Sequence, residues 1–382
     1  MLAVAVIMMA VNSFAQTSGS AAALLNRLRA LQNKGVMIGH QDDTVYGTTW
    51  HYESGKSDVL SICGDYPAVV GFELGRIETG ADKNLDGVPF DLMRREIITH
   101  HERGGIVTLC WHPVNFVTGK HHKDLSGNPV KSILKSGKAN RAFNIALERV
   151  AAFLASLKDS KGQPVPVIFR PWHEMSGDWF WWGAKGCTPS RYKELFVYTY
   201  NFMKAKGLKN IVWCYSLGSN RQDSRQRFNM YYPGDEYVDI IGIDIYDAVS
   251  KKNYMSEVQR ELMALKDIAQ EHNKLFAFTE TGFKDNPEYD WYTQKLLPAI
   301  IDSQPLYVLL WRNAWNLKDE NYGPAPDKKH APDFKRFSAN PKMLFLKNIN
   351  EKNAEKGNSW NTKTDEGKKE RPVPEGVIHF NF

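Results

Sequence analysis

The chain has 382 residues, of which 42% are hydrophobic, 24% charged and 12% aromatic. This composition is typical of a globular protein and excludes a disordered, collagen-like or coiled-coil chain. The 49 basic and 43 acidic residues give a formal net charge of +6 without a long basic run. The charge therefore gives little support for binding to nucleic acid or to a membrane surface.

The first residues form an apolar segment from Leu2 to Val11, followed by Ser13 and Ala15. This pattern resembles the hydrophobic core and cleavage site of a secretory signal peptide, and the segment is too short to span a membrane. We therefore expect residues 1–15 to be a signal peptide and the protein to be secreted or periplasmic. At the other end, residues 351–382 are polar with interspersed charge, which predicts a flexible tail.

After residue 20, short apolar runs alternate with amphipathic helical patterns. The runs are Val36–Gly39, Ala68–Leu74, Ile106–Trp111, Val165–Phe169, Ile211–Tyr215, Val238–Ile245, Leu275–Thr279 and Tyr307–Trp311. Most are continuously apolar rather than alternating, which is typical of parallel strands that are covered on both faces.

The helical patterns place apolar residues three or four positions apart, so that each forms one stripe on a helix. One stripe contains Leu24, Leu28 and Leu31, and longer ones run from Phe143 to Leu157 and from Val258 to Ile268. Eight strand-then-helix units predict a single (β/α)8 barrel, an α/β fold, over residues 21–350. A doubly wound sheet would need a phosphate-binding glycine loop after its first strand, and residues 39–42 do not form one.

Metal and redox signals are weak. The four cysteines include no CxxC pair, and Cys110 and Cys214 lie within apolar runs where small buried side chains are expected. Residues 82–87 resemble the first half of a calcium loop, but its twelfth position is Met93 instead of the bidentate glutamate. The adjacent pairs His100-His101 and His121-His122 point apart. We therefore predict no metal and no cofactor, and any disulfide pairing stays open.

Polar and aromatic residues gather at the ends of the predicted strands, where barrel enzymes carry their active sites. Glu174 follows the fourth run, and Glu280 comes directly after the seventh. Two carboxyl groups about 5–5.5 Å apart are what a retaining glycosidase needs, one as proton donor and one as nucleophile. Aromatic neighbours would raise the pKa of Glu174, while hydroxyl neighbours at Thr279 and Thr281 would keep Glu280 ionised.

Tryptophans lie close to these carboxylates in the sequence. Trp179, Trp181 and Trp182 follow Glu174, and Trp311 ends the eighth run. Flat aromatic rings stack on the apolar faces of sugar rings, which fits the same chemistry. We expect no more than two of the three clustered tryptophans to face the cleft.

The segment PVIFRPWHEMSGDWFWW (Pro166–Trp182), with Asp244–Tyr246 and Phe278–Gly282, resembles glycoside hydrolase family 26, best known for β-mannanases. The similarity extends from about Val36 to Trp315. The resemblance implies that Glu174 is the acid/base and Glu280 the nucleophile. It also implies a set of substrate-binding residues: His112, Arg170, His173, Trp179, Asp244, Tyr246 and Trp311.

Their physical roles can be assigned separately. His173 and Arg170 would orient and tune the glutamates, and Tyr246 would donate a hydrogen bond to Glu280. His112 and Asp244 would bind hydroxyls of the sugar beside the scissile bond. Trp179 and Trp311 would be stacking platforms.

The expected function is therefore retaining hydrolysis of β-1,4-mannosidic bonds in mannan, galactomannan or glucomannan by a monomer. One alternative keeps the fold and mechanism but acts on β-1,3-xylan or mixed-linkage β-glucan. Another is a barrel that binds glycans without catalysis. Attack within chains and release of mannobiose from chain ends both stay open, because the loops at 42–60, 113–139 and 313–334 decide between them.

Overall fold

The structure is a computed structural model that describes residues 20–219 and 223–354. The predicted signal peptide at 1–15 lies outside the described residues, as does residue 355 onward of the predicted tail. Residues 351–354, which were predicted to belong to that tail, continue the last helix instead.

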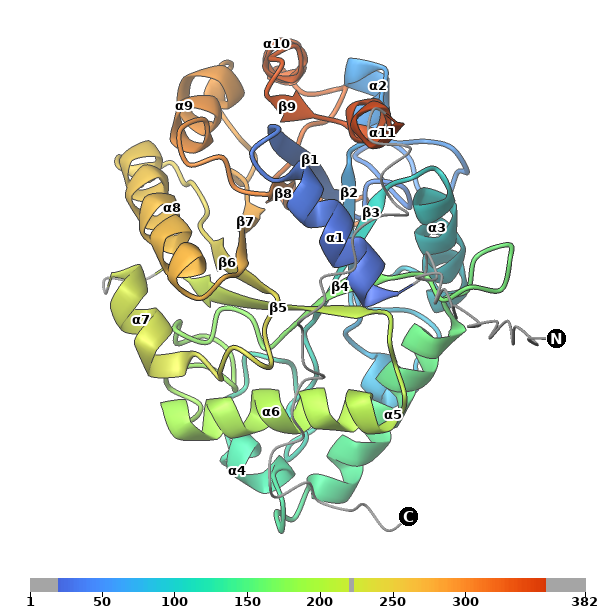
Figure 1. The fold of residues 1–382 in the computed structure, drawn as a ribbon, viewed down its shortest axis with the longest axis vertical. Helices are drawn as coiled ribbons and strands as arrows, with labels where there is room; N and C mark the ends of the chain where they lie inside the picture. Colours follow the sequence, from blue (N-terminus) through green and yellow to red (C-terminus); the bar gives the residue numbers. More distant parts are fainter. Residues whose placement is uncertain (1–19, 220–222, 355–382) are drawn as a thin grey trace, which may run out of the picture.

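Eight parallel strands close into a barrel, which confirms the predicted (β/α)8 fold (Figure 1). The strands are β1 (Val36–Gln41), β2 (Val69–Glu73), β3 (Ile106–Trp111), β4 (Val167–Pro171), β5 (Ile211–Gly218), β6 (Ile240–Asp244), β7 (Leu275–Thr281) and β8 (Tyr307–Leu310). Closure comes from β1, which pairs with both β2 and β8. A short ninth strand, β9 (Met343–Leu344), pairs with the start of β1. Each predicted apolar run forms one barrel strand.

The described helices pack around the strands, except α1, which crosses one end of the barrel (Figure 1). They are α1 (Ala21–Leu31), α2 (Asp58–Cys63), α3 (Phe90–Glu102), α4 (Pro129–Ile133), α5 (Asn140–Ser156), α6 (Pro189–Ala205), α7 (Ser224–Tyr231), α8 (Tyr254–Glu271), α9 (Leu297–Ile300), α10 (Ala331–Ser338) and α11 (Leu346–Ala354). A 3₁₀ turn, Ile77–Thr79, and a π-helical turn, Tyr292–Leu296, complete them. Within the described residues, no helix combines the length and hydropathy needed to cross a membrane.

Helix α1 closes the amino-terminal end of the barrel. Its predicted stripe of Leu24, Leu28 and Leu31 is buried and belongs to one apolar cluster with side chains such as Met37 and Ile168 from the strands. Burial of each such leucine contributes about 1.5–3 kcal/mol. Because this end is filled with apolar side chains, polar chemistry is confined to the opposite end, where the strands terminate.

The four cysteines all lie within the described residues and are free thiols. Cys110 and Cys214 are buried, as predicted from the apolar runs that contain them.

Candidate active site

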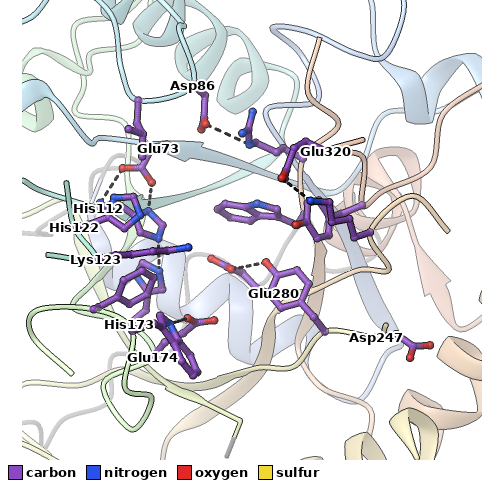
Figure 2. A pocket seen from close by; sticks show the side chains of 18 residues that line it. Glu73, Asp86, His112, His122, Lys123, His173, Glu174, Asp247, Glu280 and Glu320 are labelled. Carbon is purple, nitrogen blue, oxygen red and sulfur yellow. Dashed lines mark hydrogen bonds and ion pairs between the residues drawn. The ribbon is translucent and has the colours of Figure 1, made fainter. Parts of the chain in front are cut away.

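A cavity of about 620 Å³ opens at the carboxyl ends of the strands (Figure 2). Seven of the residues predicted for the site line it: His112, His173, Glu174, Trp179, Tyr246, Glu280 and Trp311. They come from β3, β4, β6, β7 and β8 or from the residues that follow these strands, so closure of the barrel brings them together.

Glu174 is carried by a strained turn directly after β4. Its φ is 56° and that of Trp172 is 58°, both in the left-handed region, which costs about 1–3 kcal/mol at a residue other than glycine. The indole Nε1 of Trp179 donates to Oε2 of Glu174 over 2.6 Å. Burial, reinforced by the nearby carboxylates of Asp244 and Glu280, raises the pKa of Glu174 well above its usual value. A carboxyl group in this environment is suited to donate a proton.

Glu280 is the first paired residue of β7 after a register shift against β6. Ile243 of β6 pairs with Phe278, but the next residue, Asp244, pairs with Glu280. Such an irregularity re-aims the side chain that follows it. The guanidinium of Arg170 contacts Oε1 of Glu280, and Tyr246 donates to Oε2 over 2.7 Å. Both carboxylate oxygens therefore accept hydrogen bonds, which fix the orientation of the group toward the cavity.

The donors to Glu280 differ from those expected from the sequence. Thr279 donates to Asp244 over 2.5 Å, and the Thr281 hydroxyl pairs with Tyr254 over 2.6 Å. The hydroxyls of both threonines are thus engaged by groups other than the Glu280 carboxylate, which takes its donors from Arg170 and Tyr246 instead.

The two glutamates face one another across the cavity. One carboxylate oxygen of each of Glu174, Glu280 and Asp244 lies within 4.8 Å of the others. Glu174 is 9% exposed and Glu280 is 3% exposed, and both line the cavity. This spacing agrees with the separation of about 5–5.5 Å between carboxyl groups that a retaining mechanism needs.

Arg170 and Asp244 lie behind the cavity wall, because neither is among the described residues that line it. Nη1 of Arg170 donates to Oδ2 of Asp244 over 2.8 Å and to Oγ of Ser216 over 3.0 Å. Ser216 also donates to the same Asp244 oxygen over 3.0 Å. The predicted role of Asp244 in binding a sugar hydroxyl does not fit this burial; Asp244 instead holds Arg170 against Glu280.

A chain of hydrogen bonds links three groups on the other side of the cavity (Figure 2). Nδ1 of His112 pairs with Oε2 of Glu73 at 2.6 Å, and Nε2 of His112 pairs with Nε2 of His173 at 2.9 Å. Burial opposes protonation of His112, but the Glu73 carboxylate outweighs it and raises the pKa of His112. Burial and Arg170 lower the pKa of His173 well below its usual value. His173 thus orients His112 rather than a glutamate, which differs from its predicted role.

The clustered tryptophans divide as expected. Trp179 is half-buried and lines the cavity, whereas Trp181 and Trp182 are fully buried. Their indole nitrogens donate to the carbonyl oxygens of Pro113 over 3.1 Å and of His173 over 2.8 Å. Trp181 and Trp182 therefore support the loops around the cavity, and only Trp179 of the three faces it.

Several cavity residues were missed in the sequence. They are Glu73, Leu85, Asp86, His122, Lys123, Phe180, Asp247, Lys284, Arg312, Glu320 and Tyr322. Glu73 had a usable signal, because it is an acidic residue at the end of the second apolar run, as Glu280 is in the seventh. Asp86, which was considered only as part of a calcium loop, contacts Arg312 over 3.3 Å. Phe180 lies within the quoted segment Pro166–Trp182, whereas loop residues such as Lys123 and Tyr322 had no comparable signal.

Comparison with known proteins gives consistent matches. The model of glycosyl hydrolase family 26 matches residues 11–293. A mannan endo-1,4-β-mannosidase of Bifidobacterium adolescentis is 30% identical over 362 residues, which cover 89% of this chain and 35% of that protein. An enzyme with the same name from Bacillus subtilis strain 168 is 31% identical over 316 residues, covering 77% of each chain. The chain thus spans about a third of the first relative and about three quarters of the second.

Solved structures agree. A GH26 β-mannanase of Bacteroides ovatus aligns with a TM-score of 0.83 and 39% identity, covering 86% of this chain and 96% of that one. A modular endo-β-1,4-mannanase of Cellulomonas fimi aligns with a TM-score of 0.78 and 30% identity, covering 86% and 76% of the two chains.

Proposed function

This chain belongs to glycosyl hydrolase family 26, and we propose that it is a retaining enzyme that hydrolyses β-1,4-mannosidic bonds in mannan, galactomannan or glucomannan. The observation that carries the proposal is the pair Glu174 and Glu280, whose carboxylate oxygens approach within 4.8 Å in the cavity. The substrate class is supported by the names of the relatives, which are mannan endo-1,4-β-mannosidases.

In the first step, the Glu280 carboxylate attacks the anomeric carbon of the sugar on one side of the scissile bond. Glu174 gives its proton to the glycosidic oxygen, which leaves as a hydroxyl group of the departing sugar. The bond from the anomeric carbon to this oxygen breaks as the bond to Glu280 forms. The raised pKa of Glu174 favours the protonated form that this step needs.

In the second step, water attacks the anomeric carbon and the bond to Glu280 breaks. Glu174, now a carboxylate, takes a proton from this water and returns to its starting form. Two displacements at one carbon leave its configuration unchanged. Arg170 and Tyr246 hold the Glu280 carboxylate in place through both steps.

The other cavity residues bind the sugars. Trp179 and Trp311 offer half-buried aromatic faces, and His112 offers a ring that the Glu73 carboxylate holds in place. Secretion or periplasmic location, directed by residues 1–15, is part of the proposal and suits an enzyme whose substrate is a polymer outside the cell.

The function is tested by assaying the protein on galactomannan, glucomannan, lichenan and β-1,3-xylan side by side. We expect turnover of the two mannans to exceed that of the others, and proton NMR of the first product to show the β anomer. Preference for lichenan or xylan would move the substrate to the alternative class. An α anomer formed first would contradict the role of Glu280 as nucleophile.

A further inference from the structure

The turn that carries Glu174 lies beside the end of β5 but forms no strand pairs with it. Register pairing between β4 and β5 ends at Phe169 and Trp213, but β5 continues to Gly218. On its other side, β5 stays paired with β6 up to Gly218 opposite Asp244. The last residues of β5 therefore present backbone groups to the turn that follows β4.

Ser176 occupies the place of a missing backbone pair. Its hydroxyl donates to the carbonyl oxygen of Gly218 over 2.7 Å and accepts from the Gly218 N–H over 3.0 Å. The backbone N–H of Glu174 donates to the carbonyl oxygen of Ser216 over 2.9 Å. One buried serine side chain thus satisfies both backbone groups at the end of β5.

The turn also presses closely on Gly218. A Cβ at position 218 would lie 3.1 Å from Cβ of Glu174 and 3.2 Å from Cζ2 of Trp179. The absence of a side chain at Gly218 therefore lets the acid and its indole partner sit directly on β5. Because Glu174 holds a left-handed backbone conformation, contacts outside the turn must maintain it.

We infer that Ser176 is a positioning residue, which fixes the turn bearing Glu174 on the end of β5 so that the acid is aimed at the leaving oxygen. The inference rests on the proposed function. Ser176 touches no substrate and does not line the cavity. Ser176 acts on the reaction only by positioning Glu174. It fixes Glu174 relative to β5 and β6, which carry Ser216 and Asp244, the partners of Arg170.

The test compares two substrates in the full-length protein carrying Ser176→Ala. One is mannotetraose, whose leaving sugar needs a proton; the other is 2,4-dinitrophenyl β-mannobioside, whose leaving group departs without one. The ratio kcat/KM reports steps up to this departure. We expect a loss of about 30- to 100-fold on mannotetraose, since a small misplacement of a catalytic group costs up to about 100-fold. On the activated substrate we expect a loss below about threefold, because acid catalysis contributes little there.

A matched control is Ser303→Ala. Ser303 is also buried and its hydroxyl also donates to a backbone carbonyl, that of Ile300, over 3.3 Å. It should leave both kcat/KM values unchanged, and thermal unfolding of both variants separates activity from stability. If Ser176→Ala does not fold, Ser176→Cys, which keeps the size but bonds weakly, should show the same selective loss on mannotetraose at smaller amplitude.

Equal losses on the two substrates, or no loss on either, would overturn the positioning role of Ser176. Glu174→Ala distinguishes this result from failure of the proposed function. If Glu174→Ala loses far more activity on mannotetraose than on the aryl substrate, the acid role stands whatever Ser176→Ala does. If it shows no such difference, the acid role fails and the inference about Ser176 fails with it.

Discussion

Tyr246 donates a hydrogen bond to Oε2 of Glu280 over 2.7 Å, on the oxygen that Arg170 does not contact. Burial and the nearby Glu280 charge raise the pKa of Tyr246 well above its usual value, so the phenol keeps its proton and stays a donor. The candidate nucleophile is thus held from two sides by groups on β4 and just beyond β6.

Replacing Tyr246 by Phe removes one of these donors without changing the ring. A hydrogen bond to a charged group is worth about 1.5–3 kcal/mol, so we expect kcat/KM on mannotetraose to fall about 10- to 100-fold. Tyr254→Phe is the matched control, because its buried hydroxyl contacts Thr281 beside Glu280 and not Glu280 itself. Similar activities for the two variants would argue against a role for Tyr246 in holding the nucleophile.

Glu174→Ala and Glu280→Ala should each reduce the rate on mannan at least about a thousandfold while the protein stays folded. Each removes one group that the two-step mechanism requires. Asp178→Asn is the control, since Asp178 is an exposed acid four residues after Glu174 that pairs with Lys185. Circular dichroism checks the fold, and near-normal activity of either alanine variant would refute the assignment.

Glu174 should also make stability depend on pH. Its pKa is raised in the folded protein, so the folded state binds the proton more tightly than the unfolded chain does. The resulting stability is fully present below the unfolded pKa of about 4.3 and is lost as pH rises through the folded value. Glu174→Gln cannot ionise. Its melting temperature minus that of the parent protein should therefore be larger at pH 8 than at pH 4. A difference between the two proteins that stays constant with pH would exclude this linkage.

Arg170 is the counter-charge for two buried carboxylates. Arg170→Met should lower the free energy of unfolding by about 3–5 kcal/mol, because it leaves Asp244 and Glu280 buried without their cation. Arg225→Met, which breaks an exposed pair with Glu271, should cost less than about 1 kcal/mol. Urea unfolding measures both, and equal costs would mean that Arg170 does not compensate these charges.

Glu73→Gln should lower the pKa of His112, because the neutral amide no longer stabilises the imidazolium ring. His112 would then lose its proton at a lower pH than in the parent protein. NMR of the imidazole nitrogens measures the titration, with His330 at the start of α10 as the internal reference. An unchanged His112 titration would show that the Glu73 charge does not set the pKa of His112.

The family resemblance based on Pro166–Trp182 and Phe278–Gly282 is confirmed, as is the barrel. Glu174 and Glu280 could be found because each comes after an apolar run, and strand ends share one rim in a barrel. Asp244 ends a run too, but its burial behind Arg170 gives it a different role from the predicted one. Glu73 shares this position and was missed, because its own segment contains no motif.

The sequence alone determined where the strands and helices lie and which polar residues come at the strand ends, because hydrophobic periodicity is a local property of the chain. Only the tertiary structure decided which of these residues face the cavity and which support it from behind. Arg170, Asp244 and Glu280 meet through the closure of the barrel and a register shift between β6 and β7. Contacts of this kind join residues far apart in the chain, so neighbouring sequence carries no record of them.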